Sequence, residues 1–284
     1  MNIAARFFSA FCARSDAKRD AGLTIPADIE YVRGVKYGGS PENTLHIAYP
    51  KGAADILPTI ISVHGGGYVY GSAELYRFYA ADLARRGFAV VNFNYRLAPG
   101  HTFPAPLEDL NVVMEWVLRN REAFPFDTEN IFIVGDSAGA QLTSQYAAIC
   151  SNPAYAEVMS IYPPKFNLRA VGLNCGMYDL LAKSSLSGIT SDYFTENPEI
   201  YGGKLRVLDY INENYPPAYL FSAPKDFLLD SLEPMARLLR SRGITAEYKV
   251  YGDENTGHVF HLDLRNPYGK EANDDEIAFF KRYI

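Results

Sequence analysis

Residues 131–139 read IFIVGDSAG, a β-branched apolar run that ends in a Gly-Asp-Ser-Ala-Gly turn. The apolar run is typical of a buried strand, and the residues that follow, to about Cys150, are typical of a helix. A serine between glycines on a sharp turn from a strand into a helix presents its hydroxyl at the end of that strand. Glycine fills the flanking positions because larger side chains would collide there. The stretch therefore predicts that Ser137 is a nucleophile in an α/β fold.

Strands and helices alternate around this turn from residue 58 onward. A mostly parallel sheet with helices on both faces explains such an alternation. The expected strands are residues 31–37, 44–49, 58–64, 88–95, 131–134, 169–175, 217–223 and 246–251. The expected helices are 73–86, 106–120, one from the turn 135–139 to about 150, 230–242 and about 271–282. The alternation is lost between Tyr178 and Pro216, so we expect an insertion over the sheet there.

The N-terminal residues carry apolar side chains at helical spacing. Four of them would share one face of a helix: Ile3, Phe7, Phe8 and Phe11. We therefore expect an amphipathic helix that lies on the body of the protein. The competing interpretation is the apolar core of a signal peptide, but residues 7–13 are at the lower limit of length for one.

Composition narrows the classes of partner and compartment. The chain has 284 residues with 27 basic and 33 acidic side chains, a net charge of −6, and no run of Lys or Arg. This disfavours nucleic acid or an anionic membrane as the main partner. Cys12, Cys150 and Cys175 are odd in number and widely spaced, which disfavours a disulfide framework or a cysteine metal site and favours a reducing cytoplasm. No stretch approaches the ~18 apolar residues of a membrane-spanning helix.

A serine hydroxyl needs a base beside it, usually a histidine that a carboxylate orients. Folds with this kind of turn place the three groups in the chain order serine, acid, histidine, each after a strand. The order excludes the histidines that precede Ser137, namely His46, His64 and His101. His258 follows the strand 246–251 and its loop, and we predict that it is the base. His261 is expected to be structural or at the surface.

The carboxylate is predicted to be Asp226, which follows the strand 217–223 in a short loop. Asp230 competes with it, but lies where the N-terminal cap of a helix is expected. Asp253 is too close in sequence to His258 to belong to the preceding strand's loop. A serine, histidine and aspartate triad of this kind requires no metal and no organic cofactor.

A second glycine-rich segment, HGGGY at 64–68, follows the predicted strand 58–64. Consecutive glycines expose backbone N–H groups with no side chain in the way of a ligand. Such groups stabilise the negative charge that develops on oxygen during acyl transfer. The segment precedes the nucleophile by one crossover unit, so it predicts an oxyanion hole beside Ser137.

Together these segments resemble the hormone-sensitive-lipase-like esterases, or bacterial family IV, of the α/β-hydrolase superfamily. The matching pieces are HGGGY at 64–68, YRLAPGHTFPAPLED at 95–109, GDSAG at 135–139, DFLLD at 226–230 and GHVF at 257–260. The resemblance implies an oxyanion hole built from the N–H groups of Gly66, Gly67 and Ala138. It also implies a structural role for His64. One departure is Val259, where the family commonly has a glycine.

The resemblance implies a single α/β-hydrolase domain over residues 1–284, with a small cap from about 1–30 and 178–216. The expected activity is hydrolysis of small carboxylic esters through an acyl-enzyme, as in a short-chain esterase or deacetylase. An acyl-peptidase is one rival, although such enzymes usually carry a large extra domain that this sequence does not show. A non-catalytic ligand-binding protein is the other, and the presence of His258 disfavours it. A homodimer is left open.

Short acyl groups are the expected substrates, from acetyl to about butyryl or hexanoyl. The small cap leaves little material for a long apolar groove. We expect aromatic side chains to narrow the pocket further, among them Tyr68, Tyr95 and the phenylalanines of the N-terminal helix.

Overall fold

The computed structural model describes residues 1–53, 55–182, 188–194 and 198–284, which form one eight-stranded sheet in the order β1-β2-β4-β3-β5-β6-β7-β8. The strands are β1 (Ile29–Lys36), β2 (Thr44–Pro50), β3 (Leu57–Val63), β4 (Ala89–Phe93), β5 (Phe126–Asp136), β6 (Leu168–Asn174), β7 (Ala218–Ser222) and β8 (Ala246–Val250). β2 runs antiparallel to its neighbours β1 and β4, and all other neighbouring pairs are parallel. The mostly parallel sheet that the sequence predicted is confirmed.

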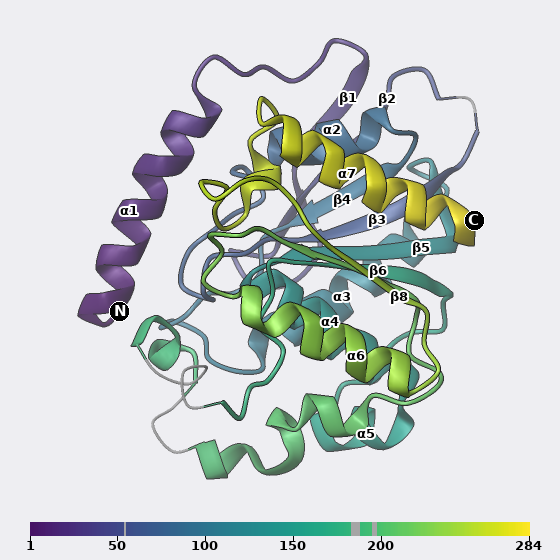
Figure 1. Cartoon of the computed structure of the whole chain (residues 1–284). Helices are drawn as coiled ribbons and strands as arrows, with labels where there is room; N and C mark the ends of the chain where they lie inside the picture. The colour runs from purple at the N-terminus through teal and green to yellow at the C-terminus, as the bar shows by residue number, and fades with distance from the viewer. Residues whose placement is uncertain (54, 183–187, 195–197) are drawn as a thin grey trace.

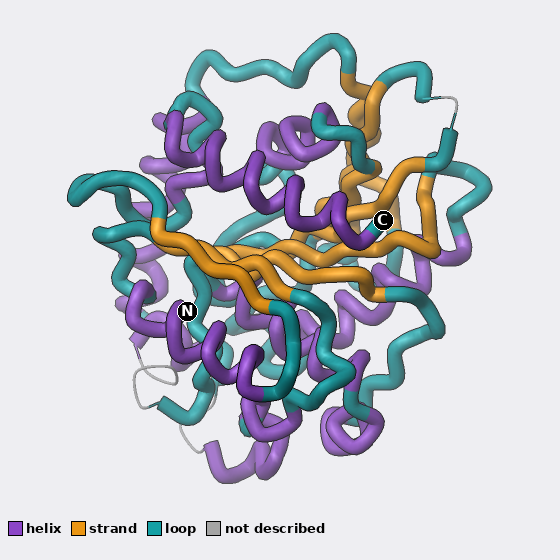
Figure 2. The backbone as a smooth tube through the Cα atoms, turned by 45° about the vertical axis from the view of Figure 1, so that its right-hand side comes forward, coloured by secondary structure: helices purple, strands orange, loops and turns teal. Residues whose placement is uncertain are grey.

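Helices cover both faces of the sheet (Figure 1; Figure 2). One face packs under α2 (Arg77–Arg85) and α7 (Pro267–Phe280), and the other packs under α3 (Ala105–Arg119), α4 (Ala138–Ser151) and α6 (Leu232–Ser241). Successive side chains of a strand point to opposite faces. Ile60 of β3 therefore belongs to the first core and Ile61 to the second, and both are fully buried.

Two parts of the chain differ from a simple alternation of strands and helices. The sequence did not predict α5 (Pro153–Met159), which begins where the Asn152 side chain accepts a hydrogen bond from the N–H of Ala154. The insertion after β6 contains short 3₁₀ helices at Gly188–Asp192, Pro198–Leu205 and Val207–Tyr210, and no strand among its described residues. The bounds of the cap, 1–30 and 178–216, stay a prediction, and residues 183–187 and 195–197 of it lie outside the described residues.

The N-terminal segment forms a helix, α1 (Ile3–Asp20), but its apolar face does not pack on the body as we expected. Ile3, Phe7 and Phe11 are 73%, 74% and 74% exposed. Ala5, on the opposite side, is the buried residue of the helix, and Phe8 packs against the core beside it. The periodicity predicted the helix correctly and its orientation wrongly. Figure 1 shows α1 along the margin of the molecule.

Polar contacts hold α1 in place. The backbone N–H of Asn2 donates to Asp192 across 2.6 Å, and the Tyr70 hydroxyl donates to Asp16 across 2.8 Å. A helix fixed by such contacts can leave its apolar face in solvent. None of the described helices is long and apolar enough to span a membrane.

Candidate active site

Ser137 lies between β5 and α4 with φ 54° and ψ −120°. A non-glycine residue rarely adopts a positive φ, because its Cβ then crowds the backbone. Here the neighbours hold the turn closed, since the Ser137 N–H donates to the carbonyl of Asn174 across 2.9 Å. A Cβ on Gly139 would lie 2.0 Å from the carbonyl oxygen of Val63, and one on Gly135 would lie 2.3 Å from that of Gly139. Both glycines of the motif are therefore required by close approach.

The predicted acid and base meet at the ends of adjacent strands. Asp226 follows β7, His258 follows β8, and His258 Nδ1 lies 2.7 Å from Asp226 Oδ1. The two loops are joined by the N–H of Lys225, which donates to the carbonyl of Thr256 across 2.9 Å. The pairing of the strands therefore continues into the loops and fixes the imidazole against the carboxylate.

Asp226 is held in its ionised form. Burial raises the pKa of this carboxyl, but hydrogen bonds from His258, the Leu228 N–H and the Ser222 hydroxyl outweigh burial and lower the pKa below its usual value. An ionised carboxylate can only accept hydrogen bonds, so His258 Nδ1 carries the proton. The other ring nitrogen, Nε2, is then free to accept one. The Ser222 contact was missed in the sequence, because nothing marks a strand serine as a partner of the acid four residues later.

The competing residues occupy different surroundings. Asp230 is exposed, in a 3₁₀ turn at Leu229–Ser231, and it does not cap the next helix as we expected, since the residue before α6 is Ser231. His261 is fully buried, with its ring edge-on to Tyr79 and Phe221. Burial lowers the pKa of His261 to about 3, which suits a structural histidine.

The glycine segment lies directly against the nucleophile turn. A Cβ on Gly65 would lie 3.2 Å from Ser137 Cβ. The backbone N–H groups of Gly66, Gly67 and Ala138 donate to no acceptor among the residues that the structure describes. Three N–H groups without a partner, on the two segments that flank a serine, are what an oxyanion hole requires.

Two buried side chains support this segment. The ring of His64 stacks on that of Tyr95 at 4.1 Å, and its Nδ1 lies 2.7 Å from the carbonyl oxygen of Gly65. Burial raises the pKa of Asp136 to about 6, and its carboxylate accepts a hydrogen bond of 2.7 Å from the hydroxyl of Tyr76. The Tyr76 oxygen in turn accepts the N–H of Gly65 at 2.9 Å. These contacts favour scaffold roles for His64 and Asp136, and Tyr76 is a partner that the sequence did not indicate.

Comparison with known proteins agrees with this geometry. A family model described as the alpha/beta hydrolase fold matches residues 60–262. The chain belongs to the α/β-hydrolase fold family. The fold and the resemblance that the sequence predicted are thereby confirmed.

Several named relatives of this α/β hydrolase are esterases. Carboxylesterase NlhH of Mycobacterium tuberculosis is 28% identical over 266 residues, which cover 89% of this chain and 82% of that protein. Versiconal hemiacetal acetate esterase of Dothistroma septosporum is 27% identical over 237 residues, 78% of this chain and 70% of that protein. The crystal structure of esterase B from Lactobacillus rhamnosis has a TM-score of 0.84 at 24% identity, covering 98% of this chain and 93% of that one.

The α/β hydrolase has a cavity of about 630 Å³ over Ser137 and His258. One wall comes from α1, which contributes Phe8, Phe11, Cys12, Ser15, Asp16 and Arg19. Tyr70, Ile189 and Phe227 also line it. The expectation for Tyr68 and Tyr95 was wrong, because both side chains are buried and neither lines this cavity. Phe227 was missed; its ring lies 4.4 Å from that of His258 and is 73% exposed.

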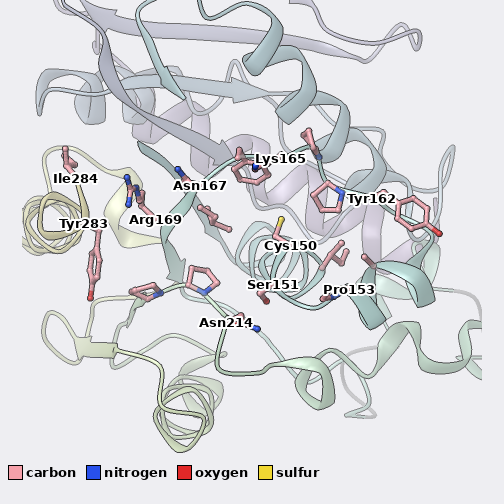
Figure 3. Close-up of a pocket in the computed structure, with 18 of the residues that line it drawn as sticks. Cys150, Ser151, Pro153, Tyr162, Lys165, Asn167, Arg169, Asn214, Tyr283 and Ile284 are labelled. Carbon is pink, nitrogen blue, oxygen red and sulfur yellow. The ribbon is translucent and has the colours of Figure 1, made fainter. Parts of the chain in front are cut away.

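A second cavity of the α/β hydrolase, an open groove of about 980 Å³, is shown in Figure 3. It is lined by the end of α4, the segment before β6 and the C-terminus, and its labelled residues include Ser151, Lys165, Arg169 and Ile284. No histidine is among its described lining residues.

One group of potential metal ligands occurs among the described residues: Cys175, Asp226 and His258, whose ligand atoms all lie within 4.8 Å of one another. Two of these residues are already hydrogen-bonded to each other as the acid and base described above. The acid–base pair thus accounts for the group.

Proposed function

We propose that this α/β hydrolase is a serine carboxylesterase that uses Ser137, His258 and Asp226 to hydrolyse small carboxylic esters. The observation that carries the proposal is the 2.7 Å contact between His258 and Asp226, at the rim of the same cavity that Ser137 lines. The relatives named carboxylesterase and acetate esterase support an ester as the bond that is broken.

In this mechanism His258 Nε2 takes the proton of the Ser137 hydroxyl while the serine oxygen attacks the ester carbonyl. No hydrogen bond joins Ser137 to His258 among the described residues, and catalytic contacts of this kind often shorten only when substrate is bound. Asp226, ionised and held by three hydrogen bonds, stabilises the imidazolium that forms. His258 then protonates the leaving alcohol, and a water molecule repeats the sequence on the acyl-enzyme.

The negative charge on the carbonyl oxygen would be stabilised by the N–H groups of Gly66, Gly67 and Ala138. Such donors are effective because they are fixed before the reaction begins and need not reorganise during it. Gly65 packs closely on the turn that carries Ser137. This packing supports the role, because it fixes the glycine segment, with its N–H donors, against the turn that carries the N–H of Ala138. No metal or organic cofactor takes part.

The assignment includes a domain organisation, a compartment and an oligomeric state. We propose one domain with a cap formed by α1 and the insertion, since both contribute residues to the wall of the cavity, Phe8 and Ile189 among them. The three cysteines are free, which favours a reducing cytoplasm. A homodimer would form at β8, whose outer edge has no neighbouring strand in the described sheet.

The direct test is hydrolysis of nitrophenyl acetate combined with labelling by a fluorophosphonate. The protein should release nitrophenol, and mass spectrometry of the tryptic peptides should find one modified residue, Ser137. Modification of another serine, including Ser185 or Ser187 outside the described residues, would contradict the assignment of the nucleophile. Absence of hydrolysis with unmodified Ser137 would favour a ligand-binding protein of the same fold.

A further inference from the structure

The outward side of α1 carries large apolar groups that pack on nothing. Ile3, Phe7 and Phe11 follow one another at spacings of four residues and are each more than 70% exposed. Side chains at this spacing lie on one side of a helix. A soluble protein rarely leaves a row of such groups in water unless the row contacts a partner.

The same side of the helix carries unpaired cations, with Arg14 and Lys18 in the row itself and Arg6 on its flank. Arg6, Arg14 and Lys18 are exposed, and no ion pair or side-chain hydrogen bond involves them among the described residues. The acidic side chains of α1 do not neutralise these cations, because Asp16 and Asp20 both pair with Arg19, at 2.8 and 2.7 Å. With 3.6 residues per turn, Arg14 and Lys18 continue the row that Phe7 and Phe11 begin.

We call this set, Ile3, Arg6, Phe7, Phe11, Arg14 and Lys18, the outer face of α1. We propose that the outer face binds a lipid surface that carries anionic headgroups. A helix with aromatic groups and cations on one side lies in the plane of such a surface, with its rings among the acyl chains and its cations at the headgroups.

The position of the helix supports a lipid surface over other partners. We call the cavity over Ser137 and His258 the catalytic cavity. Phe11 belongs both to the outer face and to the wall of this cavity. The exposed Phe227 lines the cavity beside His258. Docking through the outer face would therefore bring the mouth of the cavity to the lipid. An ester that partitions into lipid could then enter without crossing bulk water. Figure 1 shows that α1 lies at the margin of the molecule.

A second copy of the chain fits the outer face less well. A two-fold contact through one helix face brings the same residues of both copies together. Here it would place the cations of one outer face against those of the other, with no acidic side chain on either to neutralise them. An anionic surface has the opposite charge and meets the whole row at once.

The sequence alone disfavours an anionic membrane, because the chain is acidic and has no run of basic residues. The outer face explains why the proposed partner differs from this expectation. Its cations are spread over residues 6–18 and gather only when the helix forms, so a count along the chain does not find them. The net charge of −6 then opposes binding by other faces of the protein and favours one orientation.

The test is cosedimentation with vesicles of phosphatidylcholine alone and with mixed phosphatidylcholine and phosphatidylglycerol vesicles. The wild-type protein should sediment with the mixed vesicles, and the bound fraction should fall as salt is raised. Ile3→Ser combined with Phe7→Ser, and separately Arg14→Glu combined with Lys18→Glu, should each weaken binding by about tenfold or more. None of these four residues lines the catalytic cavity, so hydrolysis of nitrophenyl acetate should be unchanged.

Matched controls separate the outer face from general charge and apolarity. Arg121→Glu with Arg242→Glu makes the same change in net charge at exposed positions on other elements. Ile56→Ser with Tyr162→Ser removes two other exposed apolar groups, which are 63% and 60% exposed. Both controls should bind as the wild type does. The proposal is overturned if the wild type stays in the supernatant with mixed vesicles, if the controls lose as much binding as the outer-face variants, or if Phe7→Ser instead dissolves a dimer in solution.

Discussion

The catalytic cavity and the groove of Figure 3 differ in the chemistry of their walls far more than in size. The groove is the larger, at about 980 Å³ against about 630 Å³. Each contains a serine from one end of α4: Ser137 precedes the first residue of the helix and Ser151 is its last. A single helix therefore offers two serines in two cavities, and only one of them has the surroundings of a nucleophile.

The difference follows from the direction of the sheet. Loops at the carboxyl ends of β3, β5, β7 and β8 converge on Ser137, and they deliver glycine N–H groups, a carboxylate and an imidazole. Ser151 lies at the other end of the helix, and its hydroxyl donates back to the carbonyl of Ala147 across 2.8 Å. No described histidine lines its cavity. The two cavities therefore differ in the groups that the strand ends bring to them, and this difference does not follow from their volumes.

The largest expected effect tests this contrast between the two serines. Ser137→Ala should lower kcat on nitrophenyl acetate by a factor on the order of 10⁴ to 10⁶, because the nucleophile is lost while the fold remains. Ser151→Ala, at the other end of the same helix, should leave kcat unchanged. Both values come from steady-state kinetics, with circular dichroism as the check on folding. Retention of a tenth of the activity by Ser137→Ala would refute the assignment.

The acid can be tested by a second matched pair. Asp226→Asn should lower kcat by up to about 10⁴-fold, less than the loss for Ser137, because an amide no longer favours the required tautomer of His258. Asp230→Asn changes an exposed carboxyl four residues later and should have no effect on kcat. If Asp230→Asn were the more damaging of the two, the carboxylate would have been assigned to the wrong loop.

The nucleophile turn could be predicted from sequence because its constraints are local. Gly135 and Gly139 are fixed by contacts within a few residues and one neighbouring strand, and the pattern records them. Asp226 and His258 could be predicted as the acid and the base, because each must follow Ser137 in the chain and lie after a strand. The motifs also indicated the family, but the 2.7 Å distance between His258 and Asp226 came only from the structure.

Features that depend on contacts between distant segments were missed. The periodicity of α1 grouped Ile3, Phe7, Phe8 and Phe11 on one face. Of these, Phe8 packs against the core, whereas the other three point to solvent. Periodicity fixes which residues lie together, whereas the body of the protein decides which side is covered. Tyr76 is unmarked for the same reason, because its hydroxyl meets Asp136 across 60 positions of sequence.

Chain length of the acyl group tests what limits the catalytic cavity. Activity on nitrophenyl esters should peak between acetyl and about hexanoyl and then fall, since a methylene gains ~0.8 kcal/mol only where it finds a buried apolar wall. Phe8→Ala, which removes part of the wall on α1, should move the peak to longer chains. Tyr162→Ala, in the wall of the groove, should not move it. A wild-type maximum at decanoyl or beyond would indicate an open groove instead.

The smallest expected effect concerns a buried carboxyl of α7 that lines neither of the two cavities. Glu276 of α7 is fully buried against β6, where a Cβ on Gly172 would lie 2.1 Å from one of its carboxylate oxygens. The hydroxyl of Tyr79 donates to the other oxygen across 3.4 Å. Burial raises the pKa of Glu276 from 4.5 to about 8. By contrast with this buried carboxyl, the described residues that line the groove of Figure 3 include no acidic side chain.

A raised carboxyl pKa makes stability fall with rising pH. Between about pH 4.5 and 8 the folded protein keeps a proton on Glu276 that the unfolded chain has lost, so the free energy of unfolding decreases across this window. Glu276→Gln removes the titration but keeps the shape. Its Tm should therefore rise relative to that of the wild type as the pH goes from 5 to 8, by a few degrees. Glu129→Gln, exposed and bonded to Asn167 at the groove, should show no such trend. A constant difference in Tm between Glu276→Gln and the wild type over this range would mean that Glu276 is already ionised in the folded protein.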